Sequence, residues 1–365
     1  MSSGRAAVIR EKSGPFSIED VEIGEPRAGE VLVRTVASGI CHTDLIVRDQ
    51  VLPPGPPAIL GHEGAGVVEA VGADAGSLAP GDHVVLAPVA CGACSNCLVG
   101  HPMNCELFMP LNFGGRRADG STAYRDASGG ELNAHFFGQS SFSSHVVVPQ
   151  RSAVKVSDQA PLELLGPLGC GVQTGAGAVL SALAPAPGAS IAVFGAGAVG
   201  LSAVMGAVIA GCDPIIAVDL NTARLDMAVE LGATHALKAS EEPVEKIRAA
   251  TGGGVDFALD AVGLPVTLRQ AVDALNVGGT AGLVGAGAVG QEASLDLVNL
   301  LFGRTVKGIV EGDTVPNLFI PRLVELYLHG RFPFDKIIQC YPLADINAAV
   351  EDVEAGRAIK PVLIY

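Results

Sequence analysis

The strongest constraint on the fold lies at residues 191–204, IAVFGAGAVGLSAV, where an apolar run meets a glycine turn and then a run of small residues. The apolar run is typical of a buried strand, and the small residues after the turn of a closely packed helix. A second apolar run, IIAVD, ends at Asp219, and Asn221 is a suitable N-cap for a helix that ends near Gly232. This order of strand, turn and helix predicts a parallel, doubly wound α/β sheet.

The glycine turn also predicts a dinucleotide site. Gly195, Gly197 and Gly200 form G-x-G-x-x-G directly after a strand, which allows a tight turn, close approach of a pyrophosphate and close helix–strand packing. Asp219 follows at the end of the next strand, where a carboxylate can accept both ribose hydroxyls of NAD and would repel the 2′-phosphate of NADP. We therefore expect NAD as the cofactor.

The same string, GAGAVG, recurs at Gly285, Gly287 and Gly290. It is followed by QEASLDL, which does not continue as a long helix of small residues, and no later strand ends in an acid. We interpret this copy as a turn at the end of a strand, either a plain loop or a nicotinamide contact.

The rest of the chain differs in pattern from the predicted cofactor domain. Its first third contains short apolar or alternating runs such as RAAVIR, VLVRTVA and HVVLAP, typical of strands, while Gly114 to Ala134 is expected to lack regular structure. At 365 residues the chain is too long for one core. We predict a β-rich domain at 1–170, with 311–365 packing back onto it, and a Rossmann domain at 171–310.

Composition restricts the partners. The 23 basic and 38 acidic residues give a formal net charge of −15, which disfavours nucleic acid and anionic membranes as partners. The N-terminus shows no secretory signal, and glycines together with Asp213-Pro214 interrupt the one long apolar window. We expect a cytoplasmic protein without a membrane span.

A cluster of four cysteines predicts a structural metal site. Cys91, Cys94, Cys97 and Cys105 have the spacing C-x2-C-x2-C-x7-C, which can direct four thiolates at one zinc ion and leave no open position. Disulfides or an iron–sulfur cluster are the alternatives, and the missing export signal disfavours disulfides.

Three further residues have suggestive neighbours. Cys41 begins CHTD, His62 lies in GHEGAG, and Cys170 lies in GPLGCG shortly before the predicted cofactor domain. Their spacing alone does not connect them.

The order of CHTD, GHEGAGVV, the cysteine cluster, FFGQSSFSSHVVVP, LGCG and GAGAVG resembles the zinc-dependent medium-chain alcohol dehydrogenases over essentially the whole chain. PLELLGPLGCGVQTGAG and the tail IPRLVELY…FPFDK resemble the aryl-alcohol (benzyl alcohol) branch. The resemblance implies a GroES-like catalytic domain, a Rossmann domain, and two zinc ions per subunit, one catalytic and one structural.

The resemblance also implies roles for individual residues. Cys41, His62 and Cys170 would hold the catalytic zinc, the Cys2His set known for alcohol dehydrogenases. Asp44 would orient the histidine, and Glu63 could approach the metal from behind.

By the same resemblance, Thr43 would accept the alcohol proton. The family often has a histidine at the far end of the proton relay, but this chain has Ile46 there, so we expect His42 or solvent to take over. The expected cofactor contacts, beyond the glycines and Asp219, are made by His42, Thr174, Val199, Arg224 and Lys360. The remaining histidines, His135 among them, are interpreted as structural or solvated.

The favoured function is reversible oxidation of primary aromatic alcohols to aldehydes with NAD. Alternatives are a geraniol-type or broad-range primary alcohol dehydrogenase, and a dehydrogenase of a thiol–formaldehyde adduct. A non-catalytic NAD sensor or scaffold is a further alternative, which the complete set Cys41, Thr43, His62 and Cys170 disfavours. The expected partners are the alcohol or aldehyde and further copies of the chain, in a homodimer or homotetramer.

Overall fold

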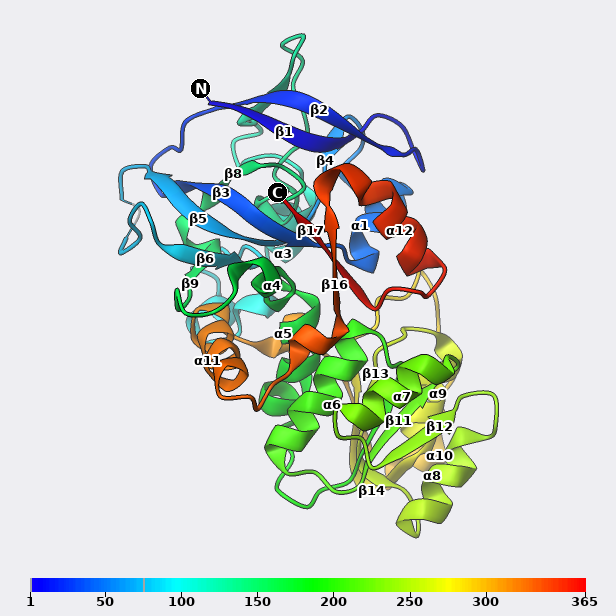
Figure 1. Cartoon of the computed structure of the whole chain (residues 1–365). Helices are drawn as coiled ribbons and strands as arrows, with labels where there is room; N and C mark the ends of the chain where they lie inside the picture. Colours follow the sequence, from blue (N-terminus) through cyan, green and yellow to red (C-terminus); the bar gives the residue numbers. More distant parts are fainter. Residues whose placement is uncertain (1, 75) are drawn as a thin grey trace. The chain divides into compact units, whose positions relative to one another are not determined.

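The computed structural model describes residues 2–74 and 76–365, which form two compact units (Figure 1). Unit 1 contains the chain up to Cys170, together with Val315–Leu328 and Asp335–Tyr365. Unit 2 contains Gly171–Thr314 and His329–Phe334. The short segments 311–314 and 329–334, which the sequence analysis assigned to the catalytic domain, therefore belong to unit 2.

Unit 2 is built on a six-stranded sheet with the order β12-β11-β10-β13-β14-β15. All its neighbouring strands are parallel, and the order is that of a doubly wound Rossmann sheet. The strands are β10 (Ile191–Phe194), β11 (Ile215–Asp219), β12 (His235–Lys238), β13 (Val255–Asp260), β14 (Leu275–Leu283) and β15 (Thr305–Gly308). The predicted parallel α/β sheet is confirmed.

Helices connect these strands. They are α5 (Gly171–Gly177), η5 (Ala178–Leu183), α6 (Ala198–Ala210), α7 (Thr222–Glu230), α8 (Pro243–Thr251), α9 (Pro265–Asp273), α10 (Leu297–Leu301) and η6 (Glu311–Asp313). Asn221 caps α7, as expected, because its side chain accepts hydrogen bonds from the backbone N–H groups of Ala223 and Arg224. The long apolar window noted in the sequence is β10, α6 and β11.

Unit 1 contains two sheets. One has the order β4-β1-β2-β7, and the other β16-β17-β3-β5-β6-β9 with β8 paired to β3. Their strands are β1 (Ser2–Ile9), β2 (Phe16–Ile23), β3 (Glu30–Gly39), β4 (Ala58–Ile59), β5 (Glu63–Val71), β6 (His83–Leu86), β7 (Tyr124–Asp126), β8 (His145–Pro149), β9 (Ala153–Lys155), β16 (Ile338–Pro342) and β17 (Lys360–Ile364). The C-terminal strand β17 pairs antiparallel with β3, which joins the tail of the chain to its first third.

Short helices lie between the strands of unit 1. They are α1 (His42–Arg48), α2 (Ser95–Leu98), η1 (Pro102–Asn104), α3 (Phe108–Phe113), η2 (Phe136–Gly138), η3 (Gln150–Ser152), α4 (Leu162–Leu165), η4 (Gly166–Gly169), α11 (Pro316–Leu328), η7 (Phe334–Ile337, across the boundary of the two units), η8 (Leu343–Asp345) and α12 (Ile346–Glu354).

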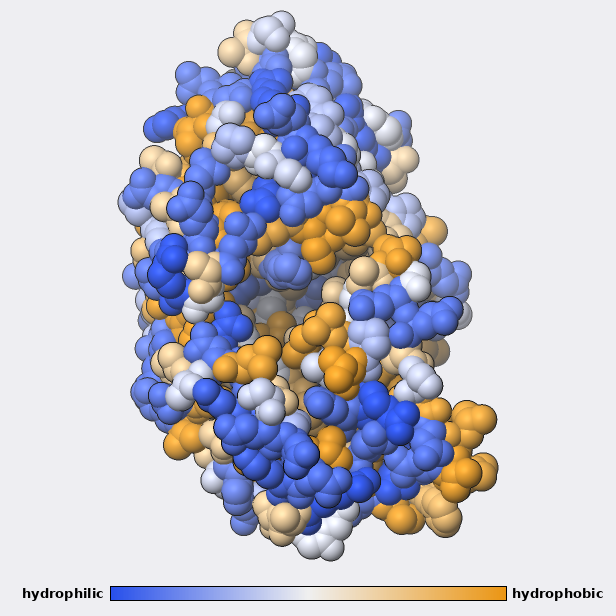
Figure 2. Space-filling model, turned by 90° about the vertical axis from the view of Figure 1, so that its right-hand side faces the viewer, coloured by the Kyte–Doolittle hydropathy of each residue, from blue (hydrophilic) through white to orange (hydrophobic). Residues whose placement is uncertain are grey.

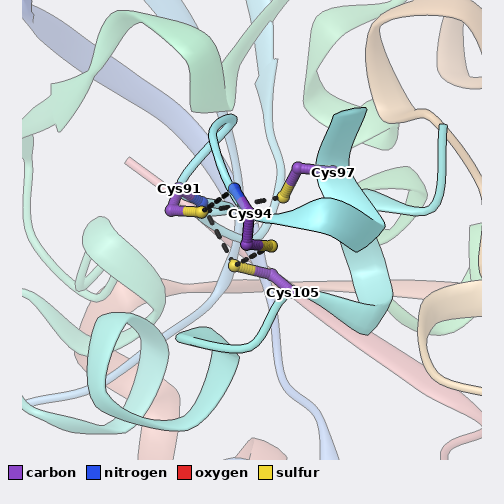
Figure 3. A group of neighbouring side chains, drawn as sticks. All are labelled: Cys91, Cys94, Cys97 and Cys105. Carbon is purple, nitrogen blue, oxygen red and sulfur yellow. Dashed lines mark hydrogen bonds between the residues drawn. The ribbon is translucent and has the colours of Figure 1, made fainter. Parts of the chain in front are cut away.

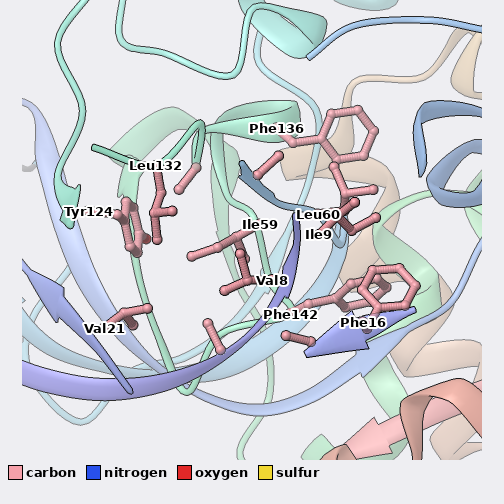
Figure 4. Close-up of a cluster of buried hydrophobic side chains, with 14 of the residues drawn as sticks. Val8, Ile9, Phe16, Val21, Ile59, Leu60, Tyr124, Leu132, Phe136 and Phe142 are labelled. Atoms are coloured by element: carbon pink, nitrogen blue, oxygen red, sulfur yellow. The ribbon is translucent and has the colours of Figure 1, made fainter. Parts of the chain in front are cut away.

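The main core of unit 1 is a cluster of buried aliphatic and aromatic side chains from β1, β2, β4 and the segments around β7 and η2 (Figure 4). Phe16 and Phe142 meet edge to face there, with ring centroids 5.6 Å apart. The cluster joins segments that are distant in sequence, and so holds the loops that carry the candidate site.

Two sequence predictions need correction. Residues 114–134 were expected to lack regular structure, but Tyr124–Asp126 forms β7, which pairs with β2. A three-residue edge strand has little local pattern, because its partner supplies the hydrogen bonds. The strand β12 was also missed, since His235–Lys238 is largely exposed and does not form an apolar run.

The surface is largely polar on the face shown in Figure 2, where apolar side chains form separate patches. Within residues 2–74 and 76–365, no helix is both long enough and apolar enough to cross a bilayer.

Candidate functional site

Unit 1 brings together the three residues that sequence spacing could not connect. Cys41 precedes α1, His62 precedes β5, and Cys170 follows η4. One ligand atom each from Cys41, His62, Glu63 and Cys170 all lie within 4.8 Å of one another. The predicted ligands of the catalytic metal therefore form one cluster, with Glu63 as its fourth member.

Close backbone approach makes this cluster possible. A Cβ on Gly39, at the end of β3, would lie 2.0 Å from Glu63 Oε2, and a Cβ on Gly166 would lie 2.3 Å from the Glu63 carbonyl oxygen. A side chain at Gly166 would push η4 away from the start of β5, and one at Gly39 would displace the Glu63 carboxylate.

Asp44 organises the site. Its carboxylate lies 2.9 Å from His62 Nδ1 and accepts hydrogen bonds from the backbone N–H groups of Cys41 at 2.9 Å and Gly61 at 3.1 Å. Asp44 and His62 are both completely buried. One carboxylate thus holds the imidazole and the backbone beside two of the predicted ligands, the orienting role expected for it.

The donor set fits a zinc ion. His62 Nε2 is buried and has no hydrogen-bond partner among the described residues, and because Nδ1 faces Asp44, Nε2 presents its lone pair to the thiols. The neighbouring Cys170 thiol and, against the effect of burial, the nearby His62 ring hold the pKa of the Cys41 thiol well below its usual value. Two thiols and one imidazole nitrogen are typical of zinc coordination.

Lys360 lies inside this site. Its Nζ contacts Glu63 Oε1 at 2.8 Å, Glu63 Oε2 at 2.9 Å and the Ile40 carbonyl oxygen at 3.1 Å. Burial lowers the pKa of a lysine, but the Glu63 carboxylate and the Cys41 thiol outweigh it and raise the pKa of Lys360. The side chain is thus a buried cation that neutralises Glu63. These contacts use all three of its N–H bonds, and the expected contact of Lys360 with the cofactor stays a prediction.

Sequence analysis missed three residues that support His62. The Gln139 amide donates to the His62 carbonyl oxygen at 3.0 Å and accepts from the Gly64 N–H at 3.1 Å. Phe137 stacks on the imidazole, with ring centroids 4.5 Å apart, and Phe136 meets it edge to face at 5.4 Å. The only sequence signal for these residues was the segment FFGQSSF, which is one of the motifs behind the family resemblance but was given no role of its own.

The four cysteines of the predicted structural site also converge (Figure 3). Cys91 Sγ lies 3.9 Å from Cys97 Sγ, and Cys94 Sγ lies 4.0 Å from Cys105 Sγ. Four sulfurs at about 2.3 Å from one zinc ion would be roughly 3.8 Å apart, so the spacing fits a tetrahedral site.

Backbone N–H groups lower the pKa of Cys91 and Cys94, whereas burial raises the pKa of Cys97 to about 12. Hydrogen bonds from the N–H groups of Ala93 and Cys94 lower the pKa of Cys91 to about 6, and the Leu107 N–H points at Cys105 Sγ at 3.4 Å. All eight cysteines are free in the structure, and the sulfur–sulfur separations of 3.9 and 4.0 Å favour a metal site over disulfides in this cluster.

In unit 2 the first glycine motif has the geometry that its spacing predicts. A Cβ on Gly200 would lie 1.7 Å from the Gly195 carbonyl oxygen, so only glycine allows α6 to pack against β10 there. A Cβ on Gly197 would meet no atom within 4 Å. Gly197 therefore borders open space at the N-terminus of α6, where an anion is favoured.

Asp219, the acid at the end of β11, is hydrogen-bonded to the glycine turn. Asp219 accepts hydrogen bonds from the Ala196 N–H at 2.7 Å and the Asn221 N–H at 2.7 Å. Val199 lies in the first turn of α6 and is partly exposed. Arg224 lies on α7, and its Nε is buried without a hydrogen-bond partner in the described part of the chain.

Thr174 is buried in α5, and its hydroxyl donates to Glu311 Oε2 at 3.2 Å. Gln173 donates to the same oxygen at 3.3 Å. Glu311 was not singled out from the sequence, since an acid in a short loop has no distinctive pattern.

The second glycine string has a packing role. A Cβ on Gly285 would lie 2.1 Å from the Gly263 nitrogen, so this glycine lets the loop after β14 pass against the loop after β13. No helix begins at this turn within the described residues, as expected from the sequence that follows it.

The proton relay is less complete than the metal site. Thr43 Oγ1 lies 3.8 Å from Cys41 Sγ and is half-buried, while His42 is exposed on the first turn of α1. Ile46 lies on the same helix and carries no titratable group.

Comparison with known proteins gives matches over both units. Residues 27–158 match the family model "Alcohol dehydrogenase GroES-like domain", and residues 198–327 match "Zinc-binding dehydrogenase". A geraniol dehydrogenase from Castellaniella defragrans is 48% identical, over 100% of this chain and 98% of its own.

Two solved structures are similar over 100% of this chain and 99% of their own. The benzyl alcohol dehydrogenase from Acinetobacter calcoaceticus superposes with a TM-score of 0.97 at 45% identity. An alcohol dehydrogenase zinc-binding domain protein from Burkholderia ambifaria superposes with a TM-score of 0.98 at 57% identity.

Proposed function

The chain belongs to the zinc-dependent alcohol dehydrogenase family, and from this premise we propose that it oxidises primary aromatic alcohols of the benzyl type, reversibly, to aldehydes with NAD. One observation carries the proposal: two thiols and an imidazole nitrogen without a partner converge in unit 1. Unit 1 is then the catalytic domain, and unit 2 the NAD-binding domain.

The substrate class is supported by two relatives. A benzyl alcohol dehydrogenase and a geraniol dehydrogenase are both similar over nearly their whole length. Benzyl alcohol and geraniol are primary alcohols whose carbinol carbon is bonded to an unsaturated carbon. Geraniol is the second candidate substrate, which the 48% identity to that relative favours.

In the proposed reaction, zinc and NAD supply the reactive chemistry, and the residues of this chain hold and orient them. When bound, zinc would supply Lewis acidity that lowers the pKa of an alcohol, and NAD would accept a hydride. Cys41, His62 and Cys170 would hold the catalytic ion, and Asp44 would keep the imidazole in the tautomer that presents Nε2. Lys360 keeps the buried Glu63 charge compensated beside the ligands.

The other groups have equally specific roles in this proposal. The four-cysteine cluster would hold a second, structural zinc. In unit 2 the open space at Gly197 would admit the NAD pyrophosphate, with Asp219 accepting the adenosine ribose hydroxyls and Arg224 beside them. Thr43 would accept the alcohol proton and His42 would pass it to solvent, because Ile46 cannot.

His42→Gln tests the proton relay. We expect kcat/KM for benzyl alcohol to fall about tenfold and its pH profile to change shape, because a positioned acid–base group is lost and solvent replaces it only partly. Steady-state NADH formation between pH 6 and 10 measures both effects. His235→Gln, another exposed histidine, should behave as wild type. Unchanged activity and an unchanged profile in H42Q would exclude His42 from the relay.

A substrate panel tests the function itself. The zinc-loaded enzyme would be assayed with benzyl, cinnamyl, geranyl and short aliphatic alcohols, each with NAD and with NADP. We expect the highest kcat/KM with benzyl alcohol and NAD, and loss of all activity on chelation. A higher value with geraniol would support the second candidate, and no turnover of any alcohol would reject the proposed activity.

A further inference from the structure

A cavity of about 530 Å³ lies in unit 1 beside the four-cysteine cluster, with Cys91 in its wall. Small-molecule sites commonly have about 300–1,000 Å³, so the space exceeds what a single inorganic ion needs. None of the candidate ligands of the catalytic metal lines it. The proposed dehydrogenase function leaves this cavity unexplained.

The cavity wall is rich in positive charge. It contains four arginines but only two acids, Glu30 and Asp119, and the arginines are Arg27, Arg116, Arg117 and Arg151. Each acid already has a cation, because Arg117 binds Glu30 through contacts of 2.7 and 2.8 Å and Arg27 lies 2.9 Å from Asp119. Arg116 in turn pairs with Glu131, outside the wall, at 2.7 Å, so the excess positive charge of the wall comes from Arg151, and it attracts anions.

Arg151 is the clearest source of the excess. Its Nη1 donates to the backbone carbonyl oxygens of Ala90, at 3.2 Å, and of Cys91. In the described part of the chain it has no carboxylate partner. The remaining guanidinium N–H groups form a fork suited to a carboxylate or phosphate.

The buried His135 adds a neutral donor to the same wall. Only 4% of the residue is exposed, and its Nε2 accepts a hydrogen bond from the Ala123 N–H at 3.2 Å, so the neutral ring carries its hydrogen on Nδ1. Burial and the nearby Arg117 lower the pKa of His135 to about 3, which keeps the ring neutral. Among residues 2–74 and 76–365 we find no acceptor for the Nδ1 hydrogen.

We propose that this cavity binds a small organic anion, whose phosphate or carboxylate contacts Arg151 and the His135 N–H and whose body packs against Val89 and Leu111. Arg151 without a carboxylate, the His135 donor in the wall and the apolar remainder of the wall each match one part of such a ligand. The site is separate from the one proposed for alcohol and NAD.

Calorimetric titration of the full zinc-loaded chain tests the site, with inorganic phosphate and acetate as separate probes at constant ionic strength. Saturating NADH is present so that phosphate cannot bind at the glycine turn. We expect one saturable site per subunit for at least one probe, and at least tenfold weaker binding in Arg151→Gln, because one charged hydrogen-bonding group is lost. The two probes distinguish a phosphate from a carboxylate head group.

Arg34→Gln is the matched control, since the Arg34 side chain is 49% exposed and pairs with Glu69 away from the cavity wall. It should bind the probes as wild type does. Because Arg151 contacts the cysteine cluster, zinc content and unfolding temperature are measured for R151Q. If R151Q loses zinc, Arg27→Gln becomes the deciding variant, because the Arg27 side chain is 53% exposed. We expect this variant to bind the probe several-fold more weakly than wild type. Wild-type affinity in the deciding variant, or no saturable binding of either probe, would overturn the proposal.

Discussion

Replacement of His62 by alanine is expected to lower kcat for benzyl alcohol oxidation at least about a thousandfold, while about one zinc ion per subunit remains bound. The change removes the imidazole Nε2 that faces Cys41 and Cys170. Lewis-acid catalysis contributes several kcal/mol to such reactions, and each 1.4 kcal/mol corresponds to about a factor of ten in rate. Steady-state NADH formation and elemental analysis of the same preparation measure both quantities.

His235→Ala is the control, because His235 is exposed on β12 in unit 2. It should retain two zinc ions and full activity. Circular dichroism would establish that H62A is folded. The metal assignment fails if H62A is active, or if fully active wild-type protein contains one zinc ion held by the four cysteines.

Exchange of Asp219 for asparagine is expected to lower kcat/KM for NAD about 10–100-fold and to raise it for NADP. A hydrogen bond to a charged group contributes about 1.5–3 kcal/mol, and the carboxylate would otherwise repel a 2′-phosphate. Asparagine keeps the shape and one acceptor, so the bonds to Ala196 and Asn221 are only partly lost. Initial rates measured with NAD and with NADP at one benzyl alcohol concentration give the ratio of kcat/KM for the two cofactors.

Asp226→Asn serves as the matched control, because Asp226 is an exposed acid on the next helix. It removes the same charge without touching the glycine turn. A cofactor ratio in D219N equal to that in D226N would exclude Asp219 as the ribose acceptor.

The fold was predictable where local patterns are strong. Buried strands such as β10 and the small-residue helix α6 follow from apolar periodicity, and the cap at Asn221 from its side chain. Elements whose stability comes from a distant partner were not predictable. β7 forms because β2 lies beside it, and an exposed strand such as β12 has no apolar run to reveal it.

The candidate site divides in the same way. The cysteine cluster and the first glycine motif are local: their spacing within a few residues already determines which atoms can meet, so the sequence by itself specified them. Cys41, His62 and Cys170 meet where β3, β5 and η4 pack closely, and Gly39 and Gly166 leave no room for side chains there. Lys360 reaches Glu63 across 297 residues. A buried ion pair of this kind depends on which surfaces exclude water together, and only tertiary packing decides that.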